Sequence, residues 1–181
     1  MIFFGILVVA LFCSLIGQEF IPALPWFFGA RVLLMPIVFF YGALAMPFWA
    51  MLFLAYIAGF MWDALNVQLL DTGVEISLGW SILLYAFLGA VMNGFRPLFQ
   101  KGRWEIHCLI SGIFTSLLVL AEYLMITFRR GDFDFSKLVW WRVGGSGAAA
   151  LFLAPFIFFI LNYIATLAGY DPHPRKPTPS A

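Results

Sequence analysis

The feature that most constrains this chain is a long stretch without charge: residues 32–62 contain no Asp, Glu, Lys or Arg. As one straight helix this stretch would reach about 46 Å at 1.5 Å per residue, well beyond the ~30 Å hydrocarbon core of a bilayer. Pro47 lies near its middle, and a proline breaks the interior of a helix. We therefore expect two membrane-spanning helices, over residues 26–45 and 48–65, joined by a tight turn, with Pro36 kinking the first.

The composition extends this conclusion to the whole chain. It is 64% hydrophobic and only 10% charged, with a mean hydropathy of +0.98, whereas soluble domains carry about 25% charged residues. One crossing needs roughly 20 apolar residues, so 181 residues accommodate about six spans and no soluble domain. The net charge of +1 gives no basic field of the kind that indicates a nucleic-acid partner.

The sequence predicts an all-α polytopic membrane protein, with a six-helix bundle over residues 1–168. The predicted spans cover residues 2–17, 26–45, 48–65, 78–95, 104–127 and a tilted or kinked segment within 138–168. The first span is expected to be retained, because no Lys or Arg precedes Arg31 as a secretory signal would require. The tail, residues 169–181, contains four prolines and is expected to be disordered.

The charges of the loops predict the orientation in the membrane. The loop after the fourth span holds a basic cluster, Arg96, Lys101 and Arg103, whereas the loop before that span holds Asp71 and Glu75 and no Lys or Arg. Basic loops stay in the cytoplasm. We therefore expect the basic loop, the tail and both termini on the cytoplasmic side.

The charged residues within predicted spans are Asp63, Glu122 and Arg142, with Arg31 and Glu105 nearer the membrane interfaces. Such groups are costly in a bilayer and are candidate functional residues. Glu122 lies about five residues before the end of its span and Arg142 about five after the start of the next, so antiparallel helices bring both to a depth of roughly 7 Å. We expect them to pair, and a structural ion pair is favoured over a substrate or proton site. Asp63 either caps the following loop or binds a partner.

Small residues at four-residue spacing predict faces where helix backbones approach closely. Three such faces are Ala55 with Gly59, Ala86 with Ala90, and Gly144 with Ala148, the last repeated one residue later at Gly145 and Ala149.

The chain shows no motif of a reaction centre. It contains no GxSxG, HExxH or CxxC, and its two histidines and two cysteines have no metal-ligand spacing. We therefore expect a protein that is not an enzyme and holds neither a metal nor a cofactor.

Several segments, in a consistent order, resemble the MreD family of bacterial rod-shape-determining membrane proteins. They are GFMWDAL (59–65), LGWSILLYAFLGAVMNGFRPLF (78–99), AEYLMI (121–126) and LAPFIFFIL (153–161). The resemblance implies a six-helix bundle similar to the substrate-binding subunits of energy-coupling-factor transporters, in the bacterial cytoplasmic membrane. It further implies a non-catalytic role in cell shape and peptidoglycan synthesis. The implied partners are membrane lipid, a bitopic MreC-like protein and, through it, the elongation polymerase, a transpeptidase and MreB.

Two functions are open at this point. The first is a scaffold subunit whose span faces bind partner membrane helices. The second is a small-molecule-binding subunit of an energy-coupling-factor-type transporter, with an aqueous pocket near Asp63, Glu122 and Arg142. A scaffold pairs its polar groups internally or presents them to a partner, whereas a binding subunit surrounds a cavity with them and with aromatic residues.

Overall fold

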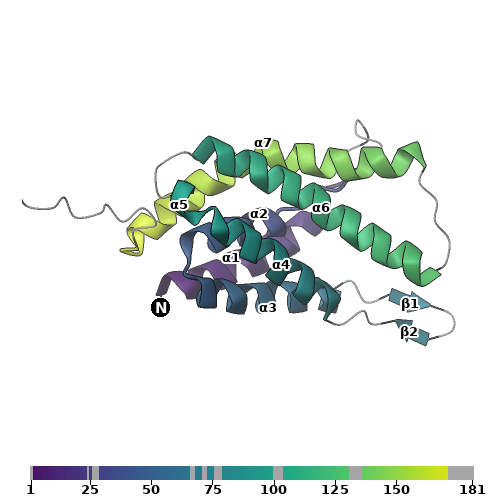
Figure 1. The fold of residues 1–181 in the computed structure, drawn as a ribbon, viewed down its shortest axis with the longest axis horizontal. Helices are drawn as coiled ribbons and strands as arrows, with labels where there is room; N and C mark the ends of the chain where they lie inside the picture. Colours follow the sequence, from purple (N-terminus) through teal and green to yellow (C-terminus); the bar gives the residue numbers. More distant parts are fainter. Residues whose placement is uncertain are drawn as a thin grey trace, which may run out of the picture.

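The structure, a computed structural model, describes residues 2–23, 25, 29–65, 68–70, 73–75, 79–99, 104–130 and 136–170. Its elements are α1 (Ile2–Glu19), α2 (Met35–Ala45), α3 (Phe48–Leu65), β1 (Gln68–Leu70), β2 (Gly73–Glu75), α4 (Trp80–Gly94), α5 (Arg96–Phe99), α6 (Trp104–Arg130) and α7 (Lys137–Leu167). The helices form an elongated bundle, and the antiparallel hairpin β1–β2 projects from the end where α3 stops and α4 starts (Figure 1). We call this the hairpin end.

Among the described residues, four helices are long and apolar enough to cross a membrane: α1, α3, α6 and α7. The α2 and α4 helices are apolar but have 11 and 15 residues, which corresponds to about 17 and 23 Å. The bundle is all-α apart from the hairpin and is consistent with a polytopic membrane protein. Of the predicted basic loop, Arg96 begins α5, while Lys101 and Arg103 lie outside the described residues, as does the tail from residue 171 onward.

Proline has different consequences at the positions where the sequence predicted breaks. Pro47 separates α2 from α3, and the helix predicted over residues 48–65 is confirmed. Pro36 was expected to kink a longer helix, but it lies in the first turn of α2. A backbone N–H in that turn would have no intrahelical acceptor, so its absence in proline costs no hydrogen bond. The helix therefore starts at Met35 rather than near residue 26. Pro155 lies inside α7, which has 31 residues and is about 46 Å long.

The short helix α2 forms the centre of the bundle (Figure 1), and all of its residues are buried. Three of its aromatic rings meet rings of the surrounding helices edge to face, with centroid distances of 5.0 to 5.7 Å: Phe39 with Tyr85, Phe40 with Phe114, and Tyr41 with Phe158. Such pairs contribute roughly 0.5–1.5 kcal/mol beyond the burial of their area. The core is therefore built around α2 by α4, α6 and α7.

The buried start of α2 receives a hydrogen-bond acceptor from α1. Gln18 Oε1 accepts from the backbone N–H groups of Leu34 and Met35, at 3.2 and 3.4 Å. The first N–H groups of a helix have no intrahelical acceptor, and a bilayer offers no water to replace one. Gln18 thus caps a helix that begins inside the bundle.

The buried end of α2 is capped by two other side chains. Asn93 Nδ2 donates to the carbonyl oxygens of Ala43 and Met46, at 2.6 and 2.9 Å. The Tyr170 hydroxyl donates to the carbonyl oxygen of Ala45 at 2.7 Å. The carbonyls that a helix end leaves without partners are satisfied from α4 and from the residue that follows α7.

Gly169 and Tyr170, which the sequence assigned to the tail, pack against the bundle. Gly169 adopts φ +69°, its N–H donates to Thr166 O, and the Tyr170 N–H donates to Ala165 O, which is the bond pattern of a glycine-terminated helix. The Tyr170 ring stacks on Phe3 with a centroid distance of 4.6 Å. These two residues therefore complete the termination of α7, and Tyr170 contacts α1.

The small-residue face of α3 packs against α4. Ala55 and Gly59 are both buried, and a Cβ on Gly59 would overlap the backbone of Ile82 and lie 2.8 Å from the carbonyl carbon of Ser81. On the α4 side, Ala86 and Ala90 are partly buried against the core. Glycine at position 59 thus lets the two backbones approach to contact.

In α7 the packed face differs from the predicted face of Gly144 and Ala148. Gly147 meets Gly112 of α6, with 2.9 Å from its Cβ position to the Gly112 carbonyl oxygen, whereas Gly144 and Ala148 are exposed and a Cβ on Gly144 would meet nothing within 4 Å. Of the second predicted face, Gly145 is buried and Ala149 is half-buried. From Gly147 onward the buried residues recur every three or four positions, the period of a helix. The buried residues of α7 are Val143, Gly145, Ser146, Gly147, Ala150, Ala154, Phe158, Leu161 and Ala165.

Candidate functional site

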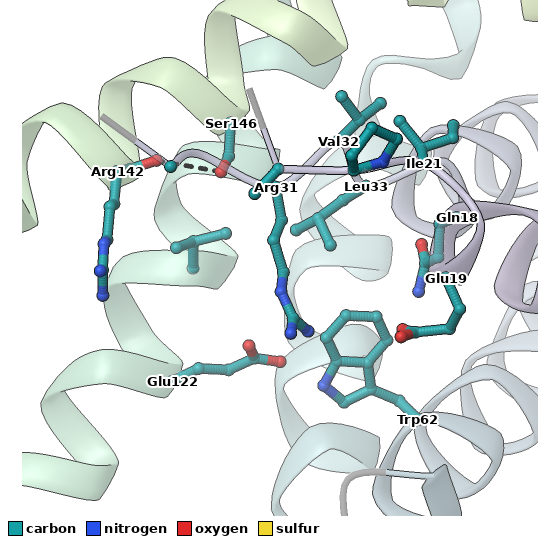
Figure 2. A pocket seen from close by; sticks show the side chains of 14 residues that line it. Gln18, Glu19, Ile21, Arg31, Val32, Leu33, Trp62, Glu122, Arg142 and Ser146 are labelled. Atoms are coloured by element: carbon teal, nitrogen blue, oxygen red, sulfur yellow. Dashed lines mark hydrogen bonds between the residues drawn. The ribbon is translucent and has the colours of Figure 1, made fainter. Parts of the chain in front are cut away.

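A cavity of about 610 Å³ lies toward the hairpin end of the bundle (Figure 2). The non-helical segment before α2, which begins at Met35, contributes Gly29, Arg31, Val32 and Leu33 to its lining. Its polar and aromatic lining includes Gln18, Glu19, Arg31, Trp62, Glu122 and Arg142.

Glu122 enters the cavity from α6 and turns toward Trp62 and Arg31 (Figure 2). The Trp62 side chain, from α3, hydrogen-bonds the carboxylate. The other carboxylate oxygen, Oε1, is buried and has no hydrogen-bond partner. Asp63, the residue after Trp62, is also acidic and opposes a negative charge on Glu122. One carboxylate oxygen therefore lacks a hydrogen bond, and no basic side chain among the described residues forms an ion pair with it.

The predicted pair of Glu122 and Arg142 is not formed. Both residues line the cavity from the neighbouring helices α6 and α7, as their matched depth implied. Arg142, however, is exposed and lies along a different wall, while Glu122 points toward Trp62 (Figure 2). Equal depth does not fix the direction in which a side chain leaves its helix. The spacing of Glu122 and Arg142 in the sequence could not show that Trp62 of α3 would be the hydrogen-bond donor to Glu122.

Asp63 is a buried cap at the end of α3. Its Oδ2 accepts from the Gly79 N–H at 2.7 Å, directly before α4. Gly79 has φ +102°, a conformation that favours glycine. A carboxylate at this place satisfies an N–H at a helix start. Of the two roles considered for Asp63, the geometry supports capping.

Sequence reasoning did not identify Trp62 as a site residue. It did not identify Gln18 or Arg31 as site residues either. The sequence did contain a signal for Trp62. Its indole N–H lies near the end of a predicted span, where a buried N–H needs a hydrogen-bond acceptor. Gln18 and Arg31 could be assigned only once α2 was known to begin at Met35.

A second surface feature is a groove of about 400 Å³ on the outer side of α7. It is lined by Trp140, Trp141, Gly144, Gly145 and Ala148. We call it the α7 groove. Both tryptophans are exposed, by 56% and 53%, and the exposed small residues Gly144 and Ala148 form its floor.

Within the described ranges, no group of three or more His, Cys, Asp or Glu residues could hold a metal ion. The polar side chains of the cavity are two carboxylates, two guanidinium groups, an amide, an indole and a hydroxyl.

Comparisons of the chain with protein-family models, with curated proteins and with solved structures find no match. The class of protein is thus set by the fold: an all-α bundle with four apolar helices of membrane-spanning length, as in multi-pass membrane proteins.

Proposed function

We propose that the chain is a non-catalytic scaffold subunit that binds the transmembrane helices of partner proteins. Given the resemblance of its sequence to the MreD family, we assign it to the complex that directs rod shape and peptidoglycan synthesis in the bacterial cytoplasmic membrane. The partners are an MreC-like bitopic protein and, through it, the elongation polymerase, a transpeptidase and MreB. Both termini are cytoplasmic in this proposal.

The observation that carries the proposal is the α7 groove. Gly144 and Ala148 have the spacing of a helix-packing face, yet they are exposed, and a Cβ on Gly144 would touch nothing within 4 Å. Small residues at this spacing let a second helix come into backbone contact, which favours association in lipid. A single transmembrane helix, such as a bitopic protein contributes, has the shape for this groove.

The tryptophans at the groove support the same interpretation. Trp140 and Trp141 lie in the first turns of α7, near the hairpin end. Tryptophan prefers the interface between lipid and water, so the groove is expected to start at the membrane surface and continue inward past Ala148. A partner helix that enters the membrane at this level would pack along it.

The test is affinity purification of the full-length chain from native membranes after mild solubilisation. We compare Gly144→Leu with Gly5→Leu, because Gly5 is also an exposed helical glycine whose Cβ position has nothing within 4 Å. Gly144→Leu should lower recovery of the MreC-like protein about tenfold, as expected when close packing worth about 1.4 kcal/mol is lost, while Gly5→Leu leaves recovery unchanged.

Equal recovery with both variants would contradict the docking face. Absence of an MreC-like protein from the unsubstituted sample would contradict the assignment to the rod-shape complex. Recovery of an ATPase module in its place would support the transporter alternative.

A further inference from the structure

Acidic and basic side chains line the cavity together: Glu19 and Glu122 are acidic, and Arg31 and Arg142 are basic. Glu122 lies beside Trp62, whereas Arg31 comes from the non-helical segment before α2 and Arg142 from α7 (Figure 2). Among the residues that the structure describes, neither guanidinium is joined to a carboxylate by an ion pair. The scaffold role uses none of these groups.

Glu122 and Trp62 form an acidic wall, on which one of the two carboxylate oxygens lacks a hydrogen-bond donor. Glu122 Oε1 is buried without a partner, and the adjacent charge is the carboxylate of Asp63. A buried carboxylate without compensation is costly, and more so at membrane depth. A primary ammonium group would supply both the missing N–H donor and the opposite charge, and the neighbouring Trp62 ring adds a favourable face for a cation.

The basic wall offers the complementary contacts. Arg31 and Arg142 are exposed and both line the cavity. A guanidinium presents several N–H donors in a planar arrangement that matches a phosphate or carboxylate group. A ligand with both an ammonium group and an anionic group would use both walls at once.

We propose that the cavity binds a zwitterion whose primary ammonium group contacts Glu122 and Trp62 and whose anionic group contacts Arg31 and Arg142. The cavity volume, about 610 Å³, lies within the range of small-ligand sites. Two sources offer this chemistry: the headgroup of phosphatidylethanolamine, and a soluble zwitterion of similar size. The site is separate from the α7 groove, so it can be tested independently of the proposed scaffold function.

The experiment is native mass spectrometry of the purified full-length protein, titrated with phosphatidylethanolamine, phosphatidylcholine or soluble phosphoethanolamine. Phosphatidylcholine carries the same phosphate but a quaternary ammonium group without N–H donors. If the source is lipid, the unsubstituted protein should bind phosphatidylethanolamine about tenfold more tightly than phosphatidylcholine, the factor given by one charge-assisted hydrogen bond of modest strength. If the source is soluble, phosphoethanolamine alone should bind at least as tightly as the lipid.

Two sets of variants assign the walls. Glu122→Gln should remove the preference for the primary ammonium group, whereas Glu105→Gln, at an exposed carboxylate in the first turn of the same helix, should keep it. The double variant Arg31→Gln with Arg142→Gln should weaken binding of both phospholipids and of phosphoethanolamine about tenfold or more. Both arginines are exposed, so the fold should tolerate their replacement.

Equal binding of the two lipids by the unsubstituted protein, with no binding of phosphoethanolamine, would overturn the proposal. A preference that survives Glu122→Gln would do the same. If Glu122→Gln fails to fold, the arginine double variant decides, and unchanged affinity for phosphoethanolamine in that variant overturns the site.

Discussion

The buried end of α2 allows a quantitative test of how the bundle is held together. Asn93 donates two hydrogen bonds, of 2.6 and 2.9 Å, to the carbonyl oxygens of Ala43 and Met46. Replacing it by Leu, which has a similar volume, removes both donors and leaves two backbone acceptors in an apolar environment. Each lost bond costs about 0.6 kcal/mol in a membrane protein, and an acceptor left buried and unsatisfied adds up to roughly 1–3 kcal/mol. We expect Asn93→Leu to lower the free energy of unfolding by about 2–3 kcal/mol.

The assay is thermal unfolding of the full-length protein in mild detergent, followed by size-exclusion chromatography. On the scale known for domains of this size, 2–3 kcal/mol corresponds to a fall in Tm of about 5–10 °C. Gly94→Leu is the control, since it adds the same side chain at the next residue, where a Cβ would meet nothing within 4 Å. A Tm for Asn93→Leu within 1–2 °C of the control, roughly the effect of half a kcal/mol, would refute the reasoning that the ends of α2 need side-chain caps.

Two further predictions concern α3. Gly59→Leu should prevent folding or lower Tm by more than 10 °C (roughly 3 kcal/mol or more), because even a Cβ overlaps the backbone of Ile82. Phe60→Leu, on the exposed side of the helix, should have little effect. Similar yields and Tm for both variants would contradict the close contact of α3 and α4. Asp63→Ala should lower the free energy of unfolding by about 1 kcal/mol, as loss of a helix cap does. Asp63→Asn should keep most of the stability, because its amide oxygen still accepts from the Gly79 N–H. Equal Tm losses in the two variants would show that the charge of Asp63, and not its role as a cap, stabilises the fold.

The sequence allowed the longer helices to be located because their signals are local. The absence of charge, together with Pro47, located α3, and apolar runs located α1, α4, α6 and α7 to within a few residues. The start of α2 was missed because Pro36 fits either a kink or a first turn. The cap supplied by Gln18, which is distant in sequence, favours the first turn.

The site was less accessible to sequence reasoning, because it depends on how helices rotate about their axes. Depth alone suggested that Glu122 would meet Arg142, but the direction of Glu122 is toward Trp62, a residue of another helix. In the same way, the spacing of Gly144 and Ala148 predicted a packing face, but in the structure both are exposed and Gly147 contacts α6.

The central claim, that the exposed small-residue face of α7 holds a partner helix, is tested most directly by site-specific photocrosslinking in native membranes. A photoreactive amino acid at position 148 should form a crosslink to an MreC-like bitopic protein, and the same amino acid at position 5 should not. A probe at position 148 that captures only lipid would contradict the account.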